Sequence, residues 1–310
     1  MKIYFAPLQG YTDAAYRRFH NEIFGGCISA YYAPFMRVEH GAPRAKDLKD
    51  IAPANNLGVE LVPQIIVKDT SELNVLVPSI ISQGYNHIDI NMGCPFPLQV
   101  KKGRGAGLLS NPNAVKLILG DLVRYKDVSF SVKMRLGNDD VNQWKDIAPI
   151  LNDAQLSHIT IHPRIATQQY KGMVLMDSFD EFYHQIKHPI IFNGDIIHPS
   201  QIEYLVTEYP RLKGVMIGRG LLTNPALAME YLENVQLDLE QRISKILEIH
   251  NKLFAYYASK LQGDSHLLTK MKTFWDYSEP IIGHKTYKLI HKAPSLSKYK
   301  EVITQIAYLK

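Results

Sequence analysis

Cys94 is the residue whose type and setting point most clearly to chemistry. It lies in the turn of residues 91–95, directly after the short apolar run of residues 87–90. A thiol with a pKa of about 8.5 is mostly protonated at neutral pH and can serve as a general acid. A nucleophile activated by a nearby cation and a buried structural thiol are the alternatives. Its place in a loop beyond a strand favours a functional thiol.

A basic, glycine-rich segment follows this turn. Residues 101–107 read KKGRGAG, so Lys101, Lys102 and Arg104 are interspersed with three glycines. Cations on a flexible loop can follow a phosphate backbone, whereas an ordinary solvated loop is the alternative. Beside Cys94, the segment indicates a polyanionic substrate.

Lys133 and His162 also stand at the ends of apolar runs. An ammonium group that points into a ligand cavity can stabilise developing negative charge, for example on a reduced flavin. It can also form a Schiff base, and a lysine that reaches out to solvent is the third interpretation. A histidine in this position can donate to a ligand carbonyl or transfer a proton, and a histidine whose hydrogen bonds are satisfied within the core is the alternative.

Two glycine-containing turns have the composition of a phosphate-binding site. They are Asn193, Gly194 and Asp195 in the first turn, and Gly218, Arg219 and Gly220 in the second. Glycine lets the backbone approach an anion closely, and an arginine adds charge. Both turns follow apolar runs, where barrel enzymes often hold a phosphate, and ordinary tight turns are the alternative.

The elements that must position these residues are eight short apolar runs. They cover residues 3–6, 28–32, 61–66, 87–90, 130–134, 158–162, 190–193 and 214–217. Helical periodicity lies between many of them, over residues 70–82, 113–125, 141–152 and 199–209. Continuous runs rich in Val and Ile are typical of a parallel sheet covered on both faces. Eight of them favour an α/β fold, a (β/α)8 TIM barrel, over an open doubly wound sheet, whose G-x-G-x-x-G motif is missing after the first run.

The chemically unusual residues follow these runs one after another. In a barrel the active site is formed by the carboxyl ends of the strands and by the loops beyond them. The pattern therefore predicts an enzyme whose site collects Cys94, Lys133, His162 and the two glycine turns.

The positive charge of the chain is concentrated in its last quarter. Residues 241–310 hold 12 lysines and arginines against 5 aspartates and glutamates, while the other residues hold 23 against 25. The pattern becomes helical near residue 238, so we predict a barrel domain over 1–238 and a small C-terminal helical domain over 239–310. Its lysines at 285, 288, 292, 298 and 300 are interleaved with Tyr287 and Tyr299, a mixture that suits RNA. A plain basic surface is the alternative.

Composition excludes several classes of protein. Two cysteines provide neither a disulfide framework nor zinc-ligand spacing. No apolar run reaches the ~18 residues of a membrane span, and no signal peptide is recognisable. We expect a cytoplasmic protein with no metal, no membrane association and no obligate protein partner.

In their order, these motifs resemble those of the tRNA-dihydrouridine synthases, flavoenzymes that reduce the C5–C6 bond of specific uridines in tRNA. The similarity covers essentially the whole chain. It is carried by residues 6–13 (APLQGYTD), Gln64, residues 91–95 (NMGCP) with 103–109, Lys133, His162 and the two glycine turns.

The resemblance implies a site and a mechanism. It assigns FMN binding to Pro7, Leu8, Gln9, Gln64, Lys133, His162, Asn193, Gly194, Asp195, Gly218 and Arg219. For the tRNA substrate we add Asn91, Lys101, Lys102, Arg104 and Arg135. NADPH would reduce FMN, hydride would pass to C6 of a flipped-out uracil, and Cys94 would protonate C5. The basic helical region would bind the tRNA.

Two features depart from the family pattern. Residues 162–170 read HPRIATQQY where many members have a glycine and a threonine, and Pro163 removes a backbone donor, which leaves the role of Arg164 open. Leu8 and Gln9 replace a common methionine and the variable residue after it. The alternatives are an FMN barrel that reduces a free pyrimidine or an enone, an RNA-binding protein without flavin, and an aldolase that uses Lys133. The modified uridine, the choice of NADPH or NADH and the oligomeric state are not determined by the sequence.

Overall fold

The computed structural model describes residues 1–308, and nine of its strands form one sheet in which every pair of neighbours is parallel. The strands follow the order β5-β2-β1-β11-β10-β9-β8-β7-β6. Their bounds are β1 (Lys2–Phe5), β2 (Ala30–Tyr32), β5 (Leu61–Val62), β6 (Gln64–Ile65), β7 (His87–Met92), β8 (Ser129–Gly137), β9 (Ile159–Ile165), β10 (Ile190–Asn193) and β11 (Leu212–Ile217). Each of the eight predicted apolar runs contributes to this sheet.

The sheet closes where its two edge strands meet. Only Pro63 separates β5 from β6, and a proline has no N–H to donate to a ladder. Its carbonyl still accepts a hydrogen bond of 2.9 Å from the backbone N–H of Asp89 on β7. Because β5 pairs with β2 and β6 pairs with β7, the two short strands fill one position. The barrel therefore has eight strand positions, which confirms the predicted (β/α)8 fold.

Strands β8 and β9 are longer than their apolar runs predict. Arg135 of β8 lies opposite His162 of β9, so polar residues continue the ladder beyond the hydrophobic segments. Both side chains are almost fully buried, and backbone pairing extends the strands to the cavity described below.

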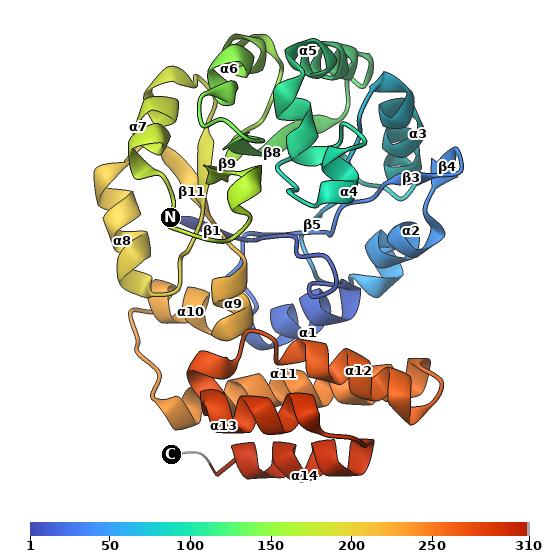
Figure 1. Ribbon diagram of the computed structural model, residues 1–310, viewed down its shortest axis with the longest axis vertical. Helices are drawn as coiled ribbons and strands as arrows, with labels where there is room; N and C mark the ends of the chain where they lie inside the picture. The colour runs from blue at the N-terminus through green and yellow to red at the C-terminus, as the bar shows by residue number, and fades with distance from the viewer. Residues whose placement is uncertain (309–310) are drawn as a thin grey trace.

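Helices surround the barrel (Figure 1). They are α1 (Ala14–Phe24), α2 (Ala45–Ile51), α3 (Thr70–Ile81), α4 (Pro97–Val100), α5 (Pro112–Asp121), α6 (Gln143–Asp153), α7 (Met176–Gln185), α8 (Pro199–Glu208), α9 (Arg219–Thr223) and α10 (Leu227–Leu232). Short 3-10 segments are η1 (Pro53–Asn55), η2 (Gly105–Ser110), η3 (Leu122–Arg124) and η4 (Ala166–Gln168), and β3 (Val38–Glu39) with β4 (Ala42–Pro43) forms an antiparallel hairpin. Side-chain capping places the start of α3: the Asp69 carboxylate accepts from the backbone N–H of Glu72 at 3.0 Å, so the helix begins at Thr70.

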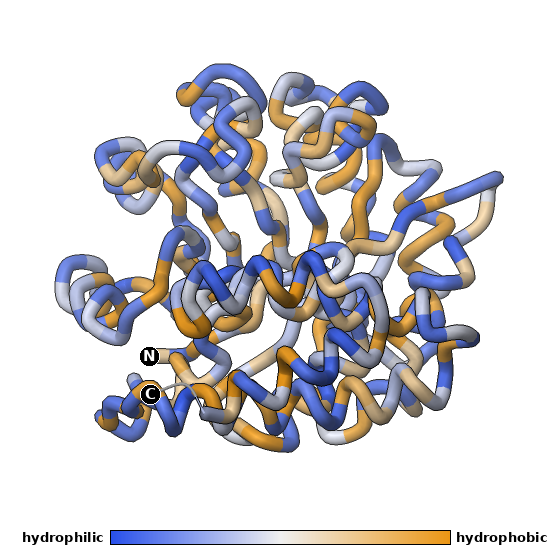
Figure 2. The backbone as a smooth tube through the Cα atoms, turned by 60° about the horizontal axis from the view of Figure 1, so that its bottom comes forward, coloured by the Kyte–Doolittle hydropathy of each residue, from blue (hydrophilic) through white to orange (hydrophobic). Residues whose placement is uncertain are grey.

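The last four helices pack against one side of the barrel, next to α1 and α9 (Figure 1). They are α11 (Leu239–Lys260), α12 (Asp264–Phe274), α13 (Glu279–Lys292) and α14 (Leu296–Ile306). Hydrophobic and hydrophilic residues alternate along their coils (Figure 2), as in amphipathic helices that bury one face. One cluster of buried apolar side chains includes residues of the strands together with Ile246, Leu253 and Trp275. The helical region thus shares its hydrophobic core with the barrel.

Tyr299 corrects a prediction made for this region. It is fully buried, its hydroxyl accepts a 2.8 Å hydrogen bond from the indole N–H of Trp275, and it lies 2.7 Å from Nε2 of His250. A side chain in this position stabilises the core and cannot stack on a nucleobase. Among the described residues 1–308, no helix is both long and apolar enough to cross a membrane.

Candidate active site

A cavity of about 730 Å³ is lined by the carboxyl ends of the barrel strands and by the loops that follow them. It brings together most of the predicted site residues: Pro7, Leu8, Gln9, Gln64, Asn91, Cys94, Lys133, Arg135, His162, Asn193, Gly194, Asp195, Gly218 and Arg219. Three predicted cations do not line it. Lys101 and Lys102 are exposed on the loop beyond Cys94, and Arg104 is buried.

Arg104 is an internal anchor, contrary to the prediction that it contacts the substrate. Only 6% of the residue is exposed. Its Nε donates to Oε2 of Glu72 at 2.9 Å, and a second nitrogen pairs with the other carboxylate oxygen. This two-point pairing ties the start of η2 to α3, so the guanidinium is not available to an RNA phosphate.

The loop that carries Cys94 is held from several sides. Oδ1 of Asn91 accepts from the backbone N–H groups of Gly93 at 3.0 Å and Cys94 at 2.8 Å. Ala106 donates its N–H to the Cys94 carbonyl at 3.1 Å. Gly105 has φ +59°, and a Cβ there would come within 2.9 Å of the Cys94 Cβ, so only glycine allows this close approach. The sulfur therefore occupies a defined place at the cavity wall.

The environment of Cys94 favours the protonated thiol. Burial raises its pKa, and this effect outweighs the hydrogen bond from the Phe96 backbone and the positive charges of Arg135 and Lys133. A half-buried thiol that keeps its proton at neutral pH suits a general acid better than a nucleophile.

A chain of buried hydrogen bonds connects the barrel core to this loop. Gln64 donates from Nε2 to Oδ2 of Asp89 at 2.7 Å, and its Oε1 accepts from Nδ2 of Asn91 at 2.8 Å. Ser131 donates to the other oxygen of Asp89 at 2.6 Å. Asp89 thereby fixes the orientation of the Asn91 amide that holds the Cys94 loop. Sequence reasoning missed it, although an aspartate inside an apolar strand was a usable signal.

Lys133 projects from β8 to the cavity with its charge only partly compensated. Burial and the neighbouring Arg135 lower its pKa to about 8, while the negative charge of Asp89 and the ionised form of Cys94 oppose the shift. No hydrogen bond contributes to the shift, so within residues 1–308 the ammonium interacts with its neighbours through space. It is positioned to interact with an electron-rich ligand in the cavity.

The structure determines which nitrogen of His162 carries the proton. Nη1 of Arg164 lies 3.0 Å from Nε2 of His162. A guanidinium is always a donor, so Nε2 must accept and the neutral imidazole is protonated on Nδ1. Burial and the nearby cations, Arg135 first, drive the pKa of His162 well below its usual value. Arg164 itself is buried and does not line the cavity; its contacts are with His162 and Asp195 behind the cavity wall.

The two predicted phosphate-binding turns lie next to each other. Asn193 donates from Nδ2 to the carbonyl of Met216 at 2.7 Å, which links the first turn to the strand before the second. The Asp195 carboxylate accepts from Arg219 at 2.7 Å and also pairs with Arg164. Two guanidinium groups therefore face one carboxylate, and the excess charge is positive.

Three tyrosines at the cavity were not predicted as site residues. Tyr170 lies under two guanidinium groups, 4.5 Å from Arg219 and 5.5 Å from Arg135, measured to its ring centroid. Tyr11 and Tyr277 meet edge to face at a centroid distance of 5.1 Å. Tyr277 follows α12, so the helical region supplies part of the cavity wall. Aromatic faces beside cations suit a flat, electron-rich substrate.

The fold and the site together define a flavin-dependent oxidoreductase on a TIM-barrel scaffold. Residues 4–307 match the family model of the dihydrouridine synthases (Dus), and the chain therefore belongs to this family. It is similar to the tRNA-dihydrouridine synthase B of Pasteurella multocida, with 31% identity over 265 residues that cover 83% of this chain and 78% of the relative. The same-named protein of Vibrio parahaemolyticus is 35% identical over 240 residues, covering 74% and 71%.

Solved structures support the barrel fold. The old yellow enzyme from Trypanosoma cruzi superposes with a TM-score of 0.52 at 10% identity and covers 76% of this chain and 89% of its own. Morphinone reductase in complex with tetrahydroNAD also gives a TM-score of 0.52, at 9% identity, with coverage of 76% and 88%. At such identities the likeness concerns the fold alone.

Proposed function

We propose that the protein reduces the C5–C6 bond of a specific uridine in tRNA to dihydrouridine, with FMN as cofactor and NADPH as reductant. One observation carries the proposal: the protonated thiol of Cys94 lines the same cavity as the residues assigned to FMN binding. The names of the curated relatives support tRNA as the substrate.

The donors of the cavity fit FMN. The Lys133 ammonium and the Nδ1–H of His162 are suitable partners for the oxygens and nitrogens of the flavin ring. Arg219 and the adjacent glycine turns offer positive charge to the phosphate. A volume of about 730 Å³ lies within the range of cofactor and ligand pockets, ~300–1,000 Å³.

In the proposed reaction, the residues that line the cavity have separate roles. When bound and reduced by NADPH, FMN would supply the hydride for C6 of the uracil. Cys94 delivers the proton to C5 from its thiol, so one hydride and one proton together saturate the double bond. Asn91 holds the Cys94 loop in place, and Lys133 stabilises negative charge that develops in the cavity. A stacked uracil cannot reach this cavity, so the nucleotide must be flipped out.

The tRNA body requires cations outside the cavity. Lys101 and Lys102 are exposed beside the Cys94 loop, and Lys285, Lys288 and Lys292 are exposed on α13. We assign the catalytic role to residues 1–238 and the main tRNA contacts to residues 239–310. Binding should therefore weaken steeply as the salt concentration rises.

The test compares two cysteine variants. Cys94→Ala should bind FMN and oxidise NADPH as the wild type does, but it should lose most dihydrouridine formation on tRNA transcripts. Cys27→Ala is the matched control, since Cys27 is buried outside the cavity. Dihydrouridine formation by Cys94→Ala at the wild-type rate would remove the assigned acid. Comparable efficiency on free uridine would favour a reductase of small pyrimidines.

A further inference from the structure

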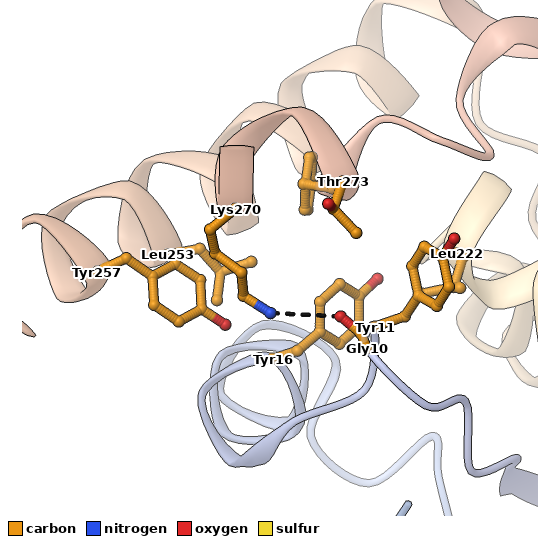
Figure 3. Close-up of a pocket in the computed structure, with 9 residues that line it drawn as sticks. Gly10, Tyr11, Tyr16, Leu222, Leu253, Tyr257, Lys270 and Thr273 are labelled. Carbon is orange, nitrogen blue, oxygen red and sulfur yellow. Dashed lines mark hydrogen bonds between the residues drawn. The ribbon is translucent and has the colours of Figure 1, made fainter. Parts of the chain in front are cut away.

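The loop of residues 6–13 links the cofactor cavity to the C-terminal helices. Pro7, Leu8 and Gln9 line the cavity that we assign to FMN. The end of the same loop, from Gly10 to Asp13, lies against α11 and α12 (Figure 3). A displacement of these helices would therefore move one wall of the cofactor site.

Lys270 of α12 makes the central contacts on the helical side. Its Nζ pairs with Oδ2 of Asp13 at 2.9 Å and donates to the carbonyl of Gly10 at 3.4 Å, the bond drawn in Figure 3. The Tyr257 hydroxyl of α11 lies within 2.8 Å of both Asp13 oxygens. These partners outweigh the effect of burial and lower the pKa of Asp13, so the carboxylate remains ionised at neutral pH.

These polar contacts lie beside a small gap in the packing of the loop. Gly10 has φ +89° in a tight turn closed by the bond from the Tyr11 N–H to the Leu8 carbonyl, 3.1 Å. A void of about 20 Å³, the size of one water site, lies between this turn and Lys270 (Figure 3). Beside this gap the turn is held by directional bonds, to which Tyr11 adds its contact with Tyr277 and a hydrogen bond of 2.9 Å from its hydroxyl to Asp276.

We propose that Lys270 is a positioning residue for FMN: it holds the loop of residues 6–13 in the conformation that binds the cofactor. The inference rests on the proposed function for the identity of the cofactor. It gives the C-terminal helices a task in the cofactor site in addition to tRNA binding. Loss of a bond to a charged group typically reduces an equilibrium constant about 10- to 100-fold.

The chain offers a matched control for Lys270. Lys252 of α11 also forms an ion pair with the barrel, to Glu22 of α1 at 3.2 Å, but this pair lies outside the loop and the cavity. Lys270→Met and Lys252→Met thus each remove one cation from the boundary between helices and barrel. Only the first should affect the loop.

The experiment measures FMN binding to apoprotein by the quenching of flavin fluorescence, without tRNA. Lys270→Met should bind FMN about 10- to 100-fold more weakly, Lys270→Arg should recover part of the loss, and Lys252→Met should stay within about twofold of the wild type. Tyr257→Phe, which keeps Lys270, should give a smaller loss and replaces Lys270→Met if that variant does not fold. Wild-type affinity in both Lys270→Met and Tyr257→Phe overturns the inference.

Hydrogen exchange separates this inference from the proposed function. In Lys270→Met, the amides of residues 8–12 should exchange about tenfold faster than in Lys252→Met, whether or not FMN is present. Wild-type protein that does not bind FMN contradicts the proposed function, and the exchange rates still decide whether Lys270 positions the loop. Unchanged exchange in the loop contradicts the positioning role.

Discussion

The variant Arg104→Met tests whether Arg104 is a structural anchor or a contact to an RNA phosphate. The substitution leaves Glu72 buried without its cation, since both side chains are less than a tenth exposed. Breaking a buried ion pair in this way costs about 3–5 kcal/mol. With an unfolding entropy of about 2.1 cal/mol/K per residue, the 310-residue chain should lose about 5–8 °C in Tm.

The assay pairs thermal unfolding with the salt dependence of tRNA binding. Arg104→Met should lower Tm by this amount. It should leave unchanged the slope of the logarithm of tRNA affinity against the logarithm of salt concentration. Lys102→Met is the control, because Lys102 is exposed on the same loop. It should leave Tm unchanged and reduce the slope by about one unit, as expected for a lost phosphate contact.

The opposite pattern would refute the reasoning. If Arg104→Met kept the wild-type Tm and reduced the salt slope, its guanidinium would contact the RNA and not Glu72. Glu72→Gln provides an independent check, because it removes the buried charge from the other side of the pair and should also lower Tm.

Three further predictions concern the cavity. FMN affinity should fall as the pH rises through about 8, where Lys133 loses its proton in the free protein, and Lys133→Met should abolish this dependence. Cys94→Ser should slow dihydrouridine formation by about 10²–10⁴-fold, because a hydroxyl is a much weaker acid. The wild-type rate should fall at alkaline pH as the thiol loses its proton, and Cys94→Ser should lack this fall. In Arg164→Met, ¹⁵N NMR of the apoprotein should show that His162 loses its preference for the Nδ1–H tautomer, whereas unchanged spectra would contradict the assignment.

The barrel and most of its site could be predicted because both depend on local sequence. Short runs rich in Val and Ile marked the strands, and the carboxyl ends of parallel strands meet at one end of a barrel. Residues such as Cys94, Lys133 and His162 therefore had to converge once the fold was assigned, and the structure places all three at one cavity.

The errors concern partners that are distant in sequence. Arg104 looked like a free cation because Glu72, its partner, lies 32 residues earlier on another element. Tyr299 looked like an RNA contact, although its spacing to Leu296 and Ile303 placed it on the apolar face of α14. Tyr277 carried no local signal, since its role depends on how the last helices pack on the barrel.

This packing determines how the role of the helical region can be tested. The rings of Tyr16 of α1 and Phe274 of α12 are tilted toward each other at a centroid distance of 6.3 Å, and the ring of Phe19 lies 6.0 Å from that of Tyr256 of α11. Removal of residues 239–310 would expose these aromatic contacts and part of the common core. Loss of activity in such a truncation would follow from misfolding as readily as from lost RNA binding. Lys288→Met on the exposed side of α13 should weaken tRNA binding alone. Lys270→Met should weaken FMN binding in the absence of RNA. The difference between the two variants separates the proposed role of the helices in tRNA binding from their proposed role at the cofactor cavity.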